Sequence, residues 1–250
     1  MKRIHHRHGL LLAVLLCGSG MLAGAQQAAE EAGGTGAVAT GEAVALEAAS
    51  PAVDPAGNPE ASTGSAEAAQ APAPATTTVI LATTMGEIHI ALEVERAPVT
   101  AANFLRYVDA KRFDGMTFYR AHKVSEDGRY AIVQGGLQNR SDKVFKPIAH
   151  ESPRQTGLSH VDGAISMARE APGTATADFF IVVGDLVSMD GTPDGSDPGY
   201  AVFGRVVQGM DVVRAMLELP RSPEARHPAM KGQMLAEPVK VLTARRAPGQ

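Results

Sequence analysis

The chain has 250 residues, of which 44% are hydrophobic and 20% are charged, and its formal net charge at pH 7 is −4. This length suits one sizeable domain together with an unstructured segment. Acids and bases are equal in number over residues 78–250, so neither nucleic-acid binding nor a strong electrostatic attraction to acidic lipid is expected.

Residues 1–25 have the three parts of a secretory signal peptide. A positively charged opening precedes an apolar run over residues 9–16, and small residues then lead to an Ala-Gly-Ala exit. The apolar run is much shorter than the ~20 residues that span a bilayer. We therefore expect cleavage after Ala25, a location in the bacterial periplasm or beyond, and no stable membrane insertion afterwards. An uncleaved membrane anchor is the alternative.

Cleavage after Ala25 would also remove Cys17, the single cysteine of the chain. The mature protein would then have no disulfide, no thiolate metal site and no cysteine nucleophile. A lipoprotein with Cys17 as its lipidated N-terminus is disfavoured, because the bulky Leu16 precedes it.

Residues 26–77 consist mostly of Ala, Gly, Glu, Pro, Ser and Thr, without an aromatic residue, Lys or Arg. Such a composition buries too little apolar area to offset the entropy cost of ordering the backbone, so we expect a disordered linker. The linker is acidic, whereas residues 78–250 carry equal numbers of acids and bases. A solvating spacer is the favoured interpretation, and a docking tail is the alternative.

Residues 78–250 are predicted to form one folded domain rich in strands. Residues 79–84 and 87–93 are typical of a hairpin, because apolar and polar residues alternate in the second segment. A helix is predicted from Pro98, since apolar residues then recur at spacings of three and four. Five further strand candidates cover residues 117–119, 131–134, 164–168, 179–183 and 202–207.

A second helix is predicted over residues 210–219, ended by Pro220, and a last strand over residues 239–243. About eight strands with two helices far apart in the sequence predict an all-β-dominated fold. The antiparallel sheet is expected to close into a barrel.

Several segments of this domain resemble the cyclophilin family, and they occur in the family's order. They are Thr-Thr-Met-Gly-Glu-Ile at 83–88, Ala-Pro-Val-Thr-Ala-Ala-Asn-Phe-Leu at 97–105, Phe-Tyr-Arg at 118–120, Val-Gln-Gly-Gly at 133–136, Gly-Ala-Ile-Ser-Met-Ala at 163–168, Phe-Phe-Ile at 179–181 and Tyr-Ala-Val-Phe-Gly-Arg at 200–205. Each is weak alone, but together they are specific. The resemblance implies a closed eight-stranded antiparallel β-barrel capped by two α-helices, and peptidyl-prolyl cis-trans isomerase activity without a cofactor.

The implied reaction is rotation about an X-Pro amide, whose barrier is ~18–20 kcal/mol because the C–N bond has partial double-bond character. The protein must hold the proline ring and stabilise a twisted amide whose nitrogen has recovered its lone pair. An arginine beside an apolar pocket can donate to that nitrogen only in the twisted state. Arg120 matches the family's catalytic arginine. Taken alone, it would be read as an exposed arginine on a strand.

The resemblance also implies a set of substrate-binding residues. Gln134 matches a glutamine that bonds the substrate backbone or holds the arginine, and Phe180 matches the floor of the proline pocket. Without the resemblance, these would be a residue of a strand-end turn and an ordinary core residue. Met189 matches an apolar wall residue, and Tyr200 stands where many members have histidine. The set is completed by Ala131, Ile132, Ala168 and Asp178.

The sequence departs from the family pattern in and around this set. Residues 122–130 lengthen the chain ahead of Gln134, and Ala-Ile at 131–132 stands where the family has Phe-Met. Asp178 replaces a glutamine, and its carboxylate could pair with Arg120 or favour positively charged substrate flanks.

Metal binding is not predicted. Residues 190–197 resemble a calcium loop, but Ala201 stands where an EF-hand needs its twelfth-position glutamate. The histidines show no ligand spacing.

We therefore predict a monomeric isomerase that acts on proline-containing polypeptides, namely unfolded or newly exported proteins whose folding it assists. The alternative is a non-catalytic cyclophilin-like module that binds Pro-containing segments. The small Ala-Ile pair favours the module, whereas the joint presence of Arg120, Gln134 and Phe180 opposes it.

Overall fold

The structure is a computed structural model that describes residues 75–138, 140, 142–225 and 227–248. The predicted signal peptide, and the predicted linker apart from its last three residues, lie outside this range. The first strand begins at Thr77, one residue before the predicted start of the domain. Among the described residues, no helix combines the length and the apolar character needed to cross a membrane.

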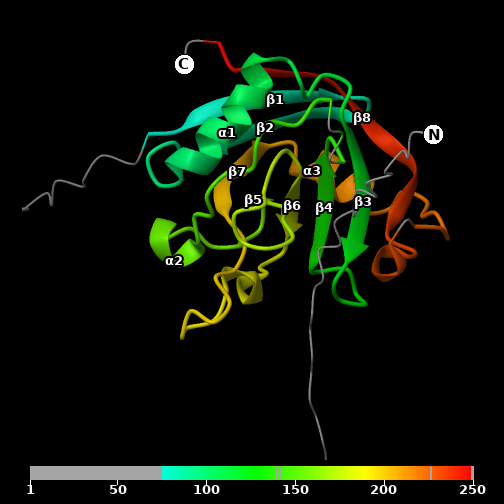
Figure 1. Ribbon diagram of the computed structural model, residues 1–250. Coiled ribbons are helices and arrows are strands. Elements are labelled where there is room, and N and C mark those ends of the chain that lie inside the picture. Colours follow the sequence, from blue (N-terminus) through cyan, green and yellow to red (C-terminus); the bar gives the residue numbers. More distant parts are fainter. Residues whose placement is uncertain (1–74, 139, 141, 226, 249–250) are drawn as a thin grey trace, which may run out of the picture. The chain divides into compact units, whose positions relative to one another are not determined.

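Eight strands form one closed barrel, which confirms the predicted fold class (Figure 1). The strands are β1 (Thr77–Thr83), β2 (Gly86–Leu92), β3 (Thr117–Lys123), β4 (Ala131–Gly136), β5 (Ala164–Met167), β6 (Phe179–Val183), β7 (Val202–Gln208) and β8 (Met234–Arg246). Their order around the barrel is β1-β2-β7-β5-β6-β4-β3-β8, and every neighbouring pair is antiparallel. The barrel is closed by β8, which pairs with both β1 and β3.

The two predicted helices are α1 (Pro98–Asp109) and α3 (Met210–Met216). Proline suits the first turn of α1, because its fixed φ is helical and its missing N–H has no intrahelical partner there. The helix α3 ends three residues earlier than predicted. Leu219 precedes Pro220, and a residue before proline is disfavoured in helical backbone.

Three short helical turns were not predicted. They are α2 (Pro153–Thr156) and the 3₁₀ turns η1 (Val187–Asp190) and η2 (Pro228–Met230). The turn α2 is held by a capping box between Ser152 and Gln155. Segments this short leave no periodic pattern in the sequence.

The inside of the barrel is filled by aromatic rings, which come from β3, β6 and β7 and from the helix α1. The Phe179 ring lies 5.9 Å from that of Phe118 and 5.3 Å from that of Phe104 on α1, and Phe104 lies 5.4 Å from Phe203. All four side chains are at most 1% exposed. Because successive side chains point to opposite faces of a strand, their neighbours point to the outer face.

Candidate active site

One row of side chains crosses four strands on the outer face of the barrel. Arg120 on β3 stands opposite Gln134 on β4, Gln134 stands opposite Phe180 on β6, and Phe180 stands opposite Ser166 on β5. Residues directly opposite each other in a sheet share a face. The structure therefore brings together three predicted site residues, and it turns Phe179 inward as the alternation predicts.

A β-bulge places Arg120 in this row. Phe118 points into the barrel, and alternation alone would point Arg120 the same way. Against β4, Phe118 stands opposite Gly135 and Arg120 stands opposite Gln134, so Tyr119 is an extra residue in β3. Such an insertion reverses the face of the residues that follow it.

Two side-chain amides hold the Arg120 guanidinium. Its Nη1 donates to Gln134 Oε1 at 2.9 Å, and its Nε and Nη2 donate to Gln233 Oε1 at 2.9 and 2.5 Å. The side chain is only 2% exposed. Burial lowers the pKa of Arg120, yet an arginine stays protonated in proteins. The site thus contains a buried positive charge whose bonded partners are neutral.

Gln134 is oriented from its other end by a buried tyrosine. Gln134 Nε2 donates to Tyr119 Oη at 2.8 Å, and Tyr119 Oη donates to Asp178 Oδ1 at 3.2 Å. Burial and the nearby Asp178 carboxylate raise the pKa of Tyr119 well above its ordinary value, so the phenol keeps its proton. Asp178 is therefore linked to Arg120 through Tyr119 and Gln134, and its carboxylate also accepts from the backbone N–H of Gln138 at 2.9 Å.

The two glycines after Gln134 are required by close packing. A Cβ on Gly135 would lie 2.7 Å from the Phe118 ring, and one on Gly136 would lie 2.6 Å from the Asp178 Cα. Gly136 also has φ +139°, a backbone conformation that side chains rarely allow. The Gln-Gly-Gly motif therefore lets β4 pack closely against β3 and the start of β6.

The remaining predicted pocket residues surround Phe180 unequally. The Tyr200 ring meets the Phe180 ring edge-on at 5.6 Å, and Tyr200 N donates to Met189 O at 3.0 Å. Ala168 N donates to Asp178 O at 2.9 Å, next to the same strand. Tyr200 and Met189 thus lie on the Phe180 side of the row, and Ala168 lies beside Asp178.

The Ala-Ile pair at the start of β4 is divided between the two faces. Ile132 stands opposite His122 and Val182, two residues from Gln134, and so shares the face of the row. Ala131 stands opposite Val183 and points with it into the barrel core. The structure therefore does not bring Ala131 to Arg120, because adjacent residues of a strand cannot share a face.

Sequence reasoning missed Gln233, which contacts the guanidinium directly. It lies 113 residues from Arg120 and just before β8, outside every segment of the resemblance. A glutamine in a loop carries no signal of its own. Only the antiparallel pairing of β8 with β3 brings it to the site.

Within the part of the chain that the structure describes, no group of three or more His, Cys, Asp or Glu side chains is arranged to hold a metal ion.

Comparisons with known proteins agree with this geometry. The family profile described as "Cyclophilin type peptidyl-prolyl cis-trans isomerase/CLD" matches residues 78–242. A peptidyl-prolyl cis-trans isomerase of Acinetobacter baylyi is 35% identical over 172 residues, covering 68% of this chain and 85% of that protein. Peptidyl-prolyl cis-trans isomerase A of Dickeya dadantii is 37% identical over 139 residues, covering 54% of this chain and 68% of that protein.

Solved structures show the same fold. A cyclophilin type peptidyl-prolyl cis-trans isomerase of Cryptosporidium parvum has a TM-score of 0.54 at 18% identity, covering 70% of this chain and 100% of that one. A structure of the same protein in the presence of the dipeptide Ala-Pro has a TM-score of 0.53. The family profile spans the whole row from Arg120 to Ser166 and also Gln233. The chain therefore belongs to the cyclophilin-type peptidyl-prolyl cis-trans isomerase family.

Proposed function

We propose that this isomerase rotates X-Pro bonds through the guanidinium of Arg120, and that its substrates are unfolded or newly exported proteins. The observation that carries the first part is the state of the Arg120 donors. A guanidinium has five N–H donors, and the bonds to Gln134 and Gln233 engage Nε, Nη1 and Nη2 once each. Among the contacts between described residues, this leaves one N–H on Nη1 and one on Nη2 for a substrate.

The chemistry follows from where that charge acts. In the planar amide the proline nitrogen has no free lone pair, because resonance delocalises it into the carbonyl. Twisting the bond returns the lone pair, and a fixed N–H donor can then bond it. Gln134 and Gln233 fix the orientation of the Arg120 guanidinium before the substrate binds, so little reorganisation accompanies the rotation. The interaction is stronger in the transition state than in the ground state, which is the requirement for catalysis.

We assign the proline ring to the Phe180 side of the row. Tyr200, Met189 and Ile132 supply further contact surface around Phe180. Gln134 is assigned to holding the arginine, because its amide oxygen accepts from Arg120 and its amide nitrogen donates to Tyr119. Ala168 and Asp178 are proposed to contact the substrate backbone and flanks.

The test is an isomerisation assay on short X-Pro peptides, comparing wild type with Arg120→Ala. We expect kcat/KM to fall by roughly 100- to 1000-fold, as when one transition-state donor is removed. Arg129→Ala is the matched control, since Arg129 is an exposed arginine of the β3–β4 loop. It should keep wild-type activity.

A different result would favour the alternative function. If wild type is no faster than the spontaneous reaction but still binds X-Pro peptides, the domain is a reader of Pro-containing segments. An Arg120→Ala variant that is folded and as active as wild type would exclude Arg120 as the catalytic residue.

The proposal of export is supported by the signal-like residues 1–25 and is tested at the N-terminus. Mass spectrometry of the protein recovered from the periplasm should find Gln26 as the first residue. A chain that retains residues 1–25 in the membrane fraction would be anchored instead. Light scattering of the purified mature chain should give the mass of a monomer.

A further inference from the structure

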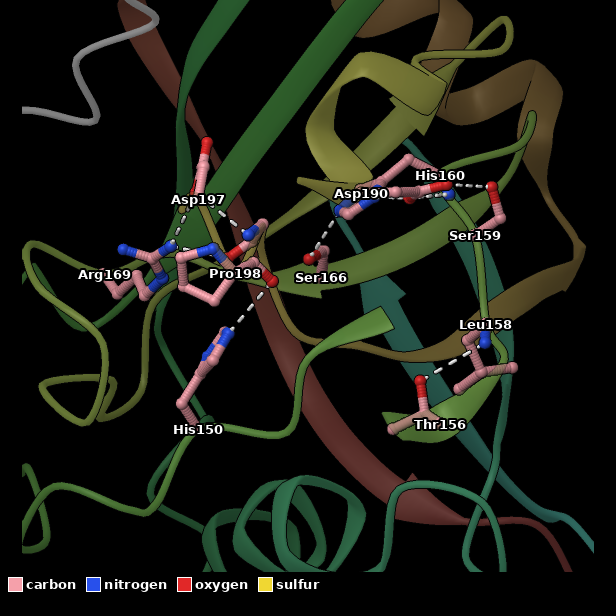
Figure 2. A network of polar contacts seen from close by, with 11 residues as sticks. His150, Thr156, Leu158, Ser159, His160, Ser166, Arg169, Asp190, Asp197 and Pro198 are labelled. Carbon is pink, nitrogen blue, oxygen red and sulfur yellow. Dashed lines mark hydrogen bonds and ion pairs between the residues drawn. The ribbon is translucent and has the colours of Figure 1, made fainter. Parts of the chain in front are cut away.

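Three side chains behind the Phe180 ring form a hydrogen-bonded chain. His160 Nε2 lies 3.0 Å from Ser166 Oγ, and His160 Nδ1 lies 2.5 Å from Asp190 Oδ1. Figure 2 shows the imidazole between Ser166 and Asp190, with the Ser159 hydroxyl donating to the same carboxylate. We call Ser166, His160 and Asp190 the His160 network.

The order serine, histidine, aspartate is that of a hydrolase triad, but the surroundings exclude a nucleophile. Ser166 and His160 are both 0% exposed. Ser166 lies within β5, between Phe180 on β6 and Val202 on β7. Ser166 Oγ is bonded to His160 Nε2, and the buried imidazole covers it, so a substrate carbonyl cannot reach this atom while the ring is in place. The network must act on the protein itself.

The bonds define the proton positions. Asp190 Oδ1 accepts from the backbone N–H of His160 at 2.9 Å as well as from Nδ1. The Nδ1 atom therefore carries the proton, and Nε2 accepts from the Ser166 hydroxyl. Burial lowers the pKa of His160, although Asp190 opposes this effect, so the ring is neutral at pH 7.

The His160 network contacts the proposed proline-binding residues, Phe180 and Met189, through both His160 and Asp190. The His160 ring lies nearly parallel to the Phe180 ring, with centroids 6.0 Å apart and planes at 11°. Asp190 is the last residue of η1, which also contains the buried Met189. The backbone adds a third link, because Leu186 N donates to His160 O at 2.7 Å just before η1.

We propose that His160 is a positioning residue of the isomerase, which ties η1 to β5 and so fixes Phe180 and Met189 as the seat of the proline ring. This rests on the proposed function in that Phe180 receives the ring. In the described part of the chain the Arg120 guanidinium bonds Gln134 and Gln233, not His160, and we assign His160 no contact with the substrate. Its loss should therefore weaken substrate binding while leaving the transition-state donor in place.

The first test uses Asp190→Asn, which removes the carboxylate partner without altering Phe180. The KM for an X-Pro peptide should rise about tenfold, as a displaced binding group predicts. The kcat should stay within about twofold, because Arg120 is untouched. The Kd for the dipeptide Ala-Pro, measured by NMR, should rise in parallel, and this readout does not depend on turnover.

The matched control is Asp194→Asn, the same change in an exposed aspartate of the same loop. It should leave KM, kcat and Kd as in wild type. Equal KM and Kd for folded Asp190→Asn and wild type would overturn the proposal. So would a loss of kcat alone, or a rise in KM that Asp194→Asn shares.

Two further measurements keep the proposal testable if Asp190→Asn does not fold. Ser166→Ala removes only the bond to Nε2 and should raise KM by a smaller factor than ten. In wild type, the ¹⁵N shifts of His160 should show protonated Nδ1 and unprotonated Nε2. The opposite tautomer, or an unchanged KM in Ser166→Ala, would contradict the proposed role.

Discussion

In the described part of the chain two arginines are buried, Arg120 on β3 and Arg169 after β5, and their hydrogen-bonding groups are satisfied in different ways. Arg120 is 2% exposed and is held by the side-chain amides of Gln134 and Gln233. Arg169 is 8% exposed, and its Nη2 donates to the backbone carbonyl of Gly199 at 2.5 Å. Both are charged groups taken out of water, which is costly unless they are bonded.

The difference lies in what surrounds each charge. Arg169 lies over the Tyr200 ring at 4.7 Å. It also has the Asp197 carboxylate at 4.0 Å (Figure 2), so its charge is partly neutralised. Its buried Nε has no hydrogen-bond partner in the described part of the chain. Arg120 has neutral bonded partners and spare donors. Burial alone therefore does not distinguish the proposed catalytic arginine from Arg169, whereas the partners of the charge do.

The largest effect is expected when each arginine is replaced by lysine, which keeps the positive charge but removes the planar guanidinium. Arg120→Lys should lower kcat/KM about 100-fold, because an ammonium cannot bond both amides and the substrate in one plane. Arg169→Lys should leave kcat/KM within about threefold, since Arg169 is given no role in the rotation. Equal losses of kcat/KM in the isomerisation assay would show that the guanidinium of Arg120 matters no more for catalysis than that of Arg169.

A second test gives Arg120 the kind of partner that Arg169 has. Gln233→Glu places a carboxylate against the guanidinium, which should stabilise the fold but weaken the field at the substrate. We expect kcat to fall about tenfold while the melting temperature rises or stays constant. If kcat is unchanged, neutral partners are not a requirement of the site.

A third test concerns the structural arginine. Arg169→Met fills a similar volume but loses the contact with the Tyr200 ring and the bond to Gly199. The free energy of unfolding, measured with urea, should fall by about 1–2 kcal/mol. A variant as stable as wild type would mean that the unpartnered Nε cancels what these contacts contribute.

The smallest expected effect is on pH dependence. The pKa of His122 is lowered by burial and by the charge of Arg120, and that of His150 is lowered by burial and, among smaller effects, by the charge of Arg169. The unfolded chain therefore takes up these protons at higher pH than the folded chain. This contributes stability above the ordinary pKa of 6.5 that is lost as the pH falls.

Urea unfolding should accordingly give a smaller free energy at about pH 5 than at about pH 7.5. His122→Gln should flatten this slope. In Arg169→Met, NMR titration should show the pKa of His150 rising while that of His122 stays constant. A shift of both histidines would mean that the two arginines act on a common environment.

The sequence was sufficient for the barrel and for the centre of the row. Alternation and turn residues mark the strands, and Arg120, Gln134 and Phe180 each lie within a motif that resembles the family. The prediction was less complete where a side chain's surroundings come from distant segments. Gln233 and His160 contact the site only after the strands pair, and no local pattern marks either residue.

The bulge in β3 shows a second limit. Composition and periodicity gave no reason to place an extra residue at Tyr119, yet this residue turns Arg120 outward. The face of Ala131 was missed for a related reason. A motif names adjacent residues together, whereas the pleat of a strand separates them.

The late position of Gln233 has a consequence for biosynthesis. A ribosome-bound or partly translocated chain that ends after β7 lacks both this glutamine and β8, the strand that closes the barrel against β1 and β3. In such a chain Arg120 lacks its bonds to Gln233, and the barrel is open between β1 and β3. The proposed catalytic site is therefore complete only after residues 233–246 have been synthesised, and we expect a shorter nascent chain to lack isomerase activity.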